Sequence, residues 1–108
     1  DVLPFMINRL PADLQEKIQL LALLGPARRA EFEFHLTDWV GSFGDDGEPV
    51  VPEIKKLKPK SLCIYGDNEK DSACPGAQNK LTKIIAWRGG HHFDGDYQSL
   101  AKSILQEL

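Results

Sequence analysis

Hydrophobic residues along the chain occur in blocks whose spacing predicts the secondary structure. Residues 2–10 are apolar around most of a helix circumference, which is typical of a helix buried in a core, and Asp1 is its expected N-cap. Residues 11–17 predict a short amphipathic helical turn. Residues 18–25 form a continuous apolar run ended by Gly-Pro, which favours a strand buried on both faces of a parallel sheet.

The rest of the chain changes between extended and helical patterns. Residues 31–36 alternate apolar and polar side chains and predict a half-exposed extended segment, and the loop that follows contains a helical turn near 53–57. Residues 61–66 and 82–87 predict two further buried strands. Residues 95–108 predict an amphipathic helix whose inner face carries Tyr97, Leu100, Ala101, Ile104 and Leu108.

This order of elements predicts an α/β fold with a mostly parallel sheet flanked by helices. A sheet of three strands with two substantial helices is thin, and the first helix is too apolar for a free end. Because that helix needs a cover, we expect residues 1–108 to be a single segment, the C-terminal part of a larger α/β domain.

Composition and charge narrow the classes of function. The net charge of −3 offers no broad attraction for nucleic acid, so no nucleic-acid partner is expected. No apolar run approaches the roughly 18 residues needed to span a bilayer. The spacing of Cys63 and Cys74 leaves two interpretations open, a pair of small buried side chains or a disulfide.

Two loops rich in titratable side chains follow two of the predicted strands. In an open α/β sheet, functional groups lie on loops beyond the carboxyl ends of the strands. Loop 66–75 supplies carboxylates, and loop 88–97 supplies adjacent histidines after two glycines. A carboxylate on one loop and a histidine on the next match the acid and base of a hydrolase triad, whose chain order is nucleophile, acid, histidine.

Within these loops the residues can be ranked as candidates. His91 directly follows a glycine and is the expected base, with His92 as the alternative base. Asp71 and Glu69 are equally suitable as the acid from the residues alone, and Asp67, close to the strand end, ranks third. The acid would hold the imidazole in one tautomer and stabilise the imidazolium as it forms.

Metal sites fit the sequence poorly. Alternate oxygen ligands from Asp67 onward resemble the start of a calcium loop, but that pattern requires Gly and Glu where this chain has Ser72 and Gln78. Residues 91–96 hold two histidines and two aspartates, yet adjacent histidines lack the usual spacing for sharing one zinc ion. We therefore expect no metal and no cofactor, and a metal-binding module at 91–96 is the least favoured hypothesis.

No residue of the chain is a convincing nucleophile. The stretch GSFG at 41–44 invites comparison with the G-x-S-x-G nucleophile elbow, but Ser42 has its glycine one residue before it instead of two. It also lies in an expected loop rather than between a strand and a helix, where the elbow has its strained turn. A hydrolase built on the two loops would take its nucleophile from elsewhere.

Four stretches of the chain resemble the VirJ/AcvB family of bacterial virulence-associated proteins, which have an α/β-hydrolase fold. In chain order these stretches are DVLPFMINRLP, FEFHLTDWVG, CIYGDNEKDSACP and GGHHFDGDY. The similarity covers nearly the whole chain. In that family the segment similar to DVLPF directly follows a nucleophile elbow of the G-x-S-x-G-A type. The resemblance therefore implies that the catalytic serine lies a few residues before Asp1, in an N-terminal half of the domain that is absent from this chain.

The resemblance implies a periplasmic, lipase-like or esterase-like serine hydrolase with a role in virulence or secretion. Its substrate would be an ester, and the example associated with the family is aminoacylated anionic phospholipid. The implied partners are the N-terminal half of the same domain, this substrate and, through the basic stretch KKLKPK at 55–60, a membrane surface. The segment alone is expected to be inactive. A non-catalytic periplasmic binding or scaffold protein with the same fold is the alternative.

The resemblance also assigns roles to residues. The base falls on His91 within GGHHF, with the next histidine as the alternative. Many α/β-hydrolases place the acid three residues after the glycine that ends the strand, which selects Glu69, whereas the KDSAC context supports Asp71, the acid that we prefer. A periplasmic location favours a disulfide between Cys63 and Cys74.

Overall fold

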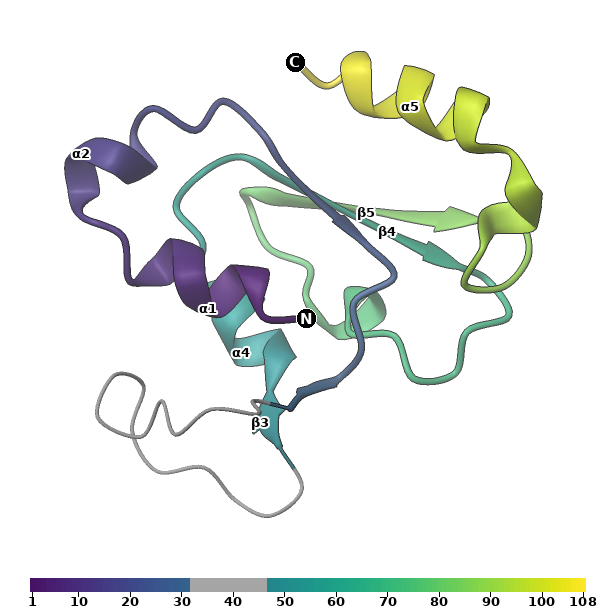
Figure 1. Ribbon diagram of the computed structural model, residues 1–108, viewed down its shortest axis with the longest axis horizontal. Coiled ribbons are helices and arrows are strands. Elements are labelled where there is room, and N and C mark those ends of the chain that lie inside the picture. Colours follow the sequence, from purple (N-terminus) through teal and green to yellow (C-terminus); the bar gives the residue numbers. More distant parts are fainter. Residues whose placement is uncertain (32–46) are drawn as a thin grey trace.

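A three-stranded parallel sheet forms the centre of the fold (Figure 1). The computed structural model describes residues 1–31 and 47–108. The strands lie in the order β1 (Leu21–Leu24), β4 (Ser61–Gly66) and β5 (Thr82–Trp87). These are the three strands that the apolar runs predict, although β1 begins three residues later than its run. The α/β class with a parallel sheet flanked by helices is confirmed.

Helices cover both faces of this sheet. On one face lie α1 (Leu3–Asn8) and α4 (Val50–Lys55), and on the other lies α5 (Tyr97–Leu105) (Figure 1). Successive side chains of a strand point to opposite faces. In the central strand β4, Cys63 therefore belongs to the core under α1 and α4, and the residues on either side of it belong to the core under α5.

Shorter elements connect these layers. The helix α2 (Ala12–Gln15) confirms the predicted helical turn, and α4 begins earlier than the turn predicted in its region. The strands β2 (Arg29–Ala30) and β3 (Glu48–Pro49) form an antiparallel pair that is too short to produce an alternating pattern. The predicted extended segment 31–36 lies outside the described residues except for its first position. No helix within 1–31 and 47–108 is long and apolar enough to cross a membrane.

The first helix forms as predicted, but its cap and its burial differ from the prediction. Asp1 does not cap it, because its Oδ1 accepts a hydrogen bond from Ala27 N at 2.8 Å. Val2 stands at the N-cap and makes no side-chain hydrogen bond. Leu3 and Met6 are exposed, and the buried face consists of Pro4, Phe5 and Ile7. Only one side of the helix thus contacts the core.

Burial on the α5 side is also smaller than the sequence predicts. Leu24 in β1 is exposed, although its apolar run predicts burial on both faces. In α5, Leu100 and Ile104 contact the core, whereas the other residues expected on the inner face are exposed, namely Tyr97, Ala101 and Leu108. The reason is that β1 is an edge strand and α5 packs on β4 and β5.

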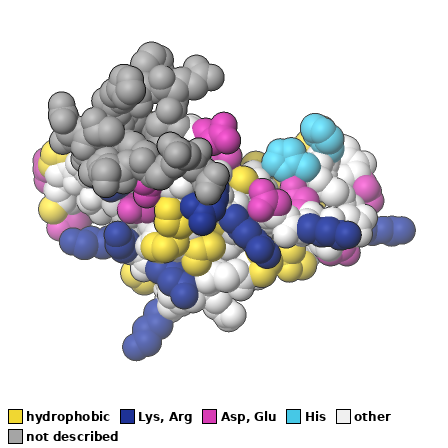
Figure 2. All heavy atoms as spheres, turned by 90° about the horizontal axis from the view of Figure 1, so that it is seen from below, with side chains coloured by type: hydrophobic (Ala, Val, Ile, Leu, Met, Phe, Trp, Pro, Cys, Tyr) yellow, Lys and Arg dark blue, Asp and Glu magenta, His cyan; other side chains and the backbone are white. Residues whose placement is uncertain are grey.

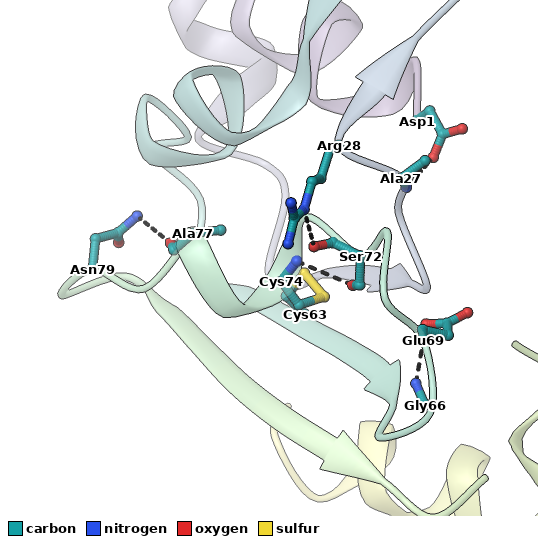
Figure 3. Close-up of a disulfide and its surroundings, with 10 residues drawn as sticks. All are labelled: Asp1, Ala27, Arg28, Cys63, Gly66, Glu69, Ser72, Cys74, Ala77 and Asn79. Atoms are coloured by element: carbon teal, nitrogen blue, oxygen red, sulfur yellow. Dashed lines mark hydrogen bonds between the residues drawn. A yellow bond between two sulfur atoms is a disulfide. The ribbon is translucent and has the colours of Figure 1, made fainter. Parts of the chain in front are cut away.

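A disulfide joins Cys63 in β4 to Cys74, the first residue of the 3₁₀ helix η1 (Cys74–Gly76) (Figure 3). This pairing confirms the disulfide that the resemblance implies. The two Cα atoms are 5.5 Å apart, and both side chains are fully buried. Closing a loop of this length contributes roughly 3 kcal/mol to stability in the chain-entropy treatment.

The buried carboxylate of Glu53 joins α4 to α1. Its side chain is 9% exposed, and its Oε2 accepts hydrogen bonds from Asn8 at 2.9 Å and Arg9 at 3.2 Å. Lys56 Nζ lies 3.4 Å from the other oxygen. Burial raises the pKa of Glu53, but the hydrogen bonds from Asn8 and Arg9 and the charges of Arg9 and Lys56 outweigh it. The pKa of Glu53 therefore lies below its ordinary value of 4.5.

We expect this contact to weaken in acid. Because the pKa of Glu53 is lower in the folded chain than in the unfolded one, its contribution is complete above pH 4.5 and is lost as pH falls through the folded value. In urea unfolding, the wild type should lose free energy of unfolding between about pH 5 and about pH 3, and Glu53→Gln should lose less. Equal losses in the two proteins would show that ionised Glu53 does not stabilise the fold.

Candidate functional site

Two loops meet at the carboxyl edge of the sheet because β4 and β5 end side by side. Their last residues, Gly66 and Trp87, are register partners. Beyond them, Asp67 N donates to Trp87 O at 2.7 Å. Asn68 N donates to Gly89 O at 3.0 Å, and Gly89 N donates to the carboxylate of Asp67 at 3.0 Å. These bonds hold the two loops together, as the parallel topology predicts.

The joined loops bring the carboxylate of Glu69 to the imidazole of His91. Glu69 Oε1 and His91 Nδ1 are 2.5 Å apart. The other carboxylate oxygen accepts from Gly66 N at 3.1 Å, and Glu69 N donates to Gly66 O at 2.9 Å, so a tight turn fixes the carboxylate (Figure 3). The side chain of Glu69 is 13% exposed and that of His91 is 65% exposed. The pair thus combines a largely buried carboxylate with a solvent-facing ring.

This hydrogen bond determines which ring nitrogen of His91 is free. An ionised carboxylate only accepts hydrogen bonds. The proton of the neutral His91 ring is therefore on Nδ1, which donates the hydrogen bond to Glu69. In the neutral ring, Nε2 then keeps its lone pair. When Nε2 accepts a proton, the carboxylate behind Nδ1 stabilises the resulting imidazolium. The arrangement is chemically suited to general acid–base work with Nε2 as the proton acceptor.

Two glycines allow the close approach of the loops. A Cβ on Gly66 would lie 2.2 Å from Gly90 O, so any side chain there would push the two loops apart. Gly25, just after β1, has φ +58°, and a Cβ there would lie 2.8 Å from His91 Nδ1 and 3.2 Å from Glu69 Oε1. Gly25 therefore forms the wall against which the Glu69–His91 pair packs.

Phe93 anchors the histidine loop to the sheet. Its side chain is buried in the core under α5, and its backbone has φ +54°, a left-handed conformation that is costly for a bulky residue. The 3₁₀ helix η2 (Phe93–Gly95) then leads into α5, where Asp96 accepts from Ser99 N at 3.3 Å as the N-cap. Burial of Phe93 thus determines where the preceding histidines lie.

The other candidate residues lie near the pair without joining it. Asp71 is exposed, and its backbone oxygen, not its side chain, accepts from Arg28 N at 3.1 Å. The His92 ring is also exposed, with its centroid 5.7 Å from that of His91 in an edge-to-face arrangement. In the part of the chain that the structure describes, neither the Asp71 carboxylate nor the His92 ring makes a hydrogen bond.

The contact therefore involves Glu69 and not Asp71, the acid that we prefer from the sequence. The physical reason is the tight turn after β4, which directs Glu69 back to Gly66 and beside His91. Asp71 lies two residues farther along, where the chain bonds to the segment after β1.

Two contributors to the site have only weak signals in the sequence. The Gly25-Pro26 pair predicts the end of a strand, but nothing local shows that this turn touches a histidine far along the chain. Asp67 ranks third as an acid, yet its carboxylate joins the two loops. Both contacts are made between distant segments, so only the strand order can reveal them.

A pocket of about 490 Å³ opens beside the pair, and its wall includes Asp1, Gly25, Glu69, Asp71 and His91. Figure 2 shows the described histidines at the surface, close to acidic side chains.

Among residues 1–31 and 47–108, no group of three or more His, Cys, Asp or Glu is placed to hold a metal ion. The GSFG stretch with Ser42 lies outside the described residues.

A protein-family model described as "Bacterial virulence protein (VirJ)" matches residues 1–108. The match includes both loops of the site and both cysteines of the disulfide. No curated protein and no solved structure gives a significant match.

Gly25→Ala should displace the Glu69–His91 pair. The new Cβ would enter the space of the His91 ring, and the left-handed backbone adds a cost of about 1–3 kcal/mol. Ring ¹⁵N shifts of His91 should change, and urea unfolding should report the loss of stability. Gly90→Ala is the matched control, because a Cβ there meets no atom within 4 Å. An unchanged His91 signal in Gly25→Ala would contradict the described packing.

Proposed function

The chain belongs to the VirJ family of bacterial virulence proteins, and from this premise we propose that it supplies the acid and the base of a serine ester hydrolase. In this proposal Glu69 is the acid and His91 is the base. The nucleophilic serine lies in the N-terminal half of the same domain, before Asp1. The observation that carries the proposal is the 2.5 Å contact between Glu69 Oε1 and His91 Nδ1.

The proposed roles follow from the free Nε2 of His91. Nε2 takes the proton of the serine hydroxyl while the serine oxygen attacks the ester carbonyl carbon, and the imidazolium then protonates the leaving alkoxide. A water molecule, activated in the same way, attacks the acyl-enzyme and releases the carboxylic acid and the free serine. The Glu69 carboxylate remains ionised and stabilises the imidazolium in both steps.

We place the serine in the pocket beside the pair. Asp1 lines this pocket together with His91, and Ala27 N holds its carboxylate just beyond β1. A strand parallel to β1 and followed by α1 would make the usual right-handed crossover and would end beside Asp1. Within 1–31 and 47–108 the outer edge of β1 has no partner strand, so it is free to pair with that strand.

The compartment and the substrate are further parts of the proposal. The disulfide fits an extracytoplasmic protein, because disulfides persist in oxidising compartments, and we propose the periplasm. The substrate is an ester, and the aminoacyl ester of an anionic phospholipid, which the family resemblance suggests, is the first to test. Neither a metal nor a cofactor has a part in the proposed steps.

Contact between residues 55–60 and an anionic membrane is a separate proposal. Lys58 and Lys60 are exposed, although Lys60 also bonds to Glu107, and a basic residue near such a membrane contributes about 1 kcal/mol. This stretch directly precedes β4, whereas the site follows the same strand. A membrane bound there would lie at the opposite end of β4 from the pocket.

In the protein that carries the N-terminal half, His91→Ala should lower kcat/KM for ester hydrolysis by about 10²–10⁴-fold, because the variant lacks the proton acceptor. His92→Ala is the matched control and should keep most of the activity, since its ring lies outside the hydrogen bond. Hydrolysis of a 4-nitrophenyl ester measures both variants. A larger loss of kcat/KM in His92→Ala than in His91→Ala would reassign the base to His92. Residues 1–108 alone should show no ester hydrolysis.

A fluorophosphonate probe tests the nucleophile in the same protein. We expect a single labelled serine that precedes Asp1. Folded protein that takes up no label would favour the alternative, a non-catalytic periplasmic binding or scaffold protein.

Comparison of Glu69→Gln with Asp71→Asn tests the acid. The amide of Glu69→Gln carries no charge to stabilise the imidazolium, so kcat should fall by at least about 10²-fold. Asp71→Asn changes an exposed pocket residue whose carboxylate makes no hydrogen bond to His91 within the described residues, so it should lower kcat less than Glu69→Gln does. A larger loss in Asp71→Asn than in Glu69→Gln would reassign the acid.

A further inference from the structure

The loop that carries Glu69 is closed at both ends on the sheet. Cys63 is in β4 and Cys74 is at the start of η1, and Glu69 lies between them in sequence. Both cysteines are fully buried, and the disulfide attaches η1 to the central strand (Figure 3). The far end of the Glu69 loop therefore cannot move away from β4 while the disulfide is intact.

Asp71 and Ser72, near the far end of the Glu69 loop, line the pocket beside the pair. Asp71 O accepts from Arg28 N at 3.1 Å, and Ala73 N donates to Pro26 O at 2.7 Å. These bonds attach the residues just before Cys74 to the segment after β1, which begins at Gly25, the residue against His91. The position of Cys74 therefore affects both the carboxylate loop and the wall that confines the ring.

Between these attachments Glu69 has few bonds of its own. Its carboxylate and its backbone both bond to Gly66, and its second partner is the exposed ring of His91. Within the described residues Lys70, which follows it, makes no hydrogen bond. Without the disulfide this loop can sample more positions, whereas its closure between Cys63 and Cys74 restricts Glu69 to positions close to the observed one.

We propose that the Cys63–Cys74 disulfide positions the Glu69–His91 pair, so that the pair is formed in a larger fraction of chains oxidised at these two cysteines than of reduced chains. Oxidation removes two electrons and two protons from the two thiols and transfers them to a disulfide of the oxidising compartment, which becomes a dithiol. Cys63 and Cys74 are positioning residues and touch no substrate. The inference rests on the proposed function for its catalytic consequence, but the hydrogen bond can be measured without any activity.

The test compares the oxidised protein that carries the N-terminal half with its Cys63→Ala/Cys74→Ala variant, by ring ¹⁵N shifts of the histidines at a pH where the rings are neutral. In the oxidised protein His91 should be the Nδ1–H tautomer. In the variant the Nδ1–H population should fall at least about twofold, because the acceptor that selects this tautomer is displaced. His92, which has no carboxylate partner within 1–31 and 47–108, is the internal control and should not change.

The variant Glu69→Ala separates positioning from general stability, because it removes the hydrogen-bond acceptor of His91 Nδ1. If the disulfide acts through Glu69, its removal in the Glu69→Ala background should change the His91 shifts no further. An additional change of the same size there would overturn the proposal. So would an unchanged Nδ1–H population in the double-alanine variant.

If the double-alanine variant unfolds in buffer, the spectra are recorded in concentrated sucrose, which favours the compact state. A variant that remains unfolded there would overturn the proposal, because the disulfide would then be needed for the whole sheet and not for the Glu69 loop.

Activity of the complete protein gives the second readout. Loss of the disulfide should lower kcat by about 100-fold with a smaller change in KM, as expected when a catalytic group is displaced by about 1 Å. A tautomer change in a protein without esterase activity would support the positioning role and contradict the proposed hydrolase. Full activity without the disulfide would contradict the positioning role and leave the hydrolase intact.

Discussion

The site depends on one constraint, the parallel register in which β4 and β5 end together at Gly66 and Trp87. Strands that end in register release their loops at the same edge, and the carboxylate of Asp67 then joins the loops by accepting from Gly89 N. This arrangement brings Glu69 and His91 to the same edge of the sheet, which no local turn could do because the two residues are far apart in sequence. The backbone arrangement at the ends of β4 and β5 thus determines where the side chains of the site can act.

Some features of the fold can be predicted because local sequence determines them. The bounds of β4 and β5 agree with the apolar runs 61–66 and 82–87, and α5 lies within the amphipathic stretch 95–108. Burial is predicted less well, because it depends on what covers each face. Leu24 and Leu108 have the right spacing for a core, but the described chain places no layer over them.

The choice between the Asp71 and Glu69 carboxylates also depends on contacts that the local sequence does not reveal. From the sequence, Asp71 and Glu69 both lie on the correct loop after the correct strand. The selection is made by the turn in which Glu69 bonds twice to Gly66, and by Gly25, whose missing side chain leaves room for the ring. These are contacts between segments separated by long stretches of chain, so a linear pattern of residue types cannot rank them.

The most direct test of the account is a crystal structure of the complete protein after phosphonylation of its nucleophile. We predict that His91 Nδ1 is within hydrogen-bond distance of Glu69 and that Nε2 faces the phosphonylated serine. A structure in which the His91 ring is turned to solvent, with Asp71 or His92 at the phosphonyl group instead, would contradict it.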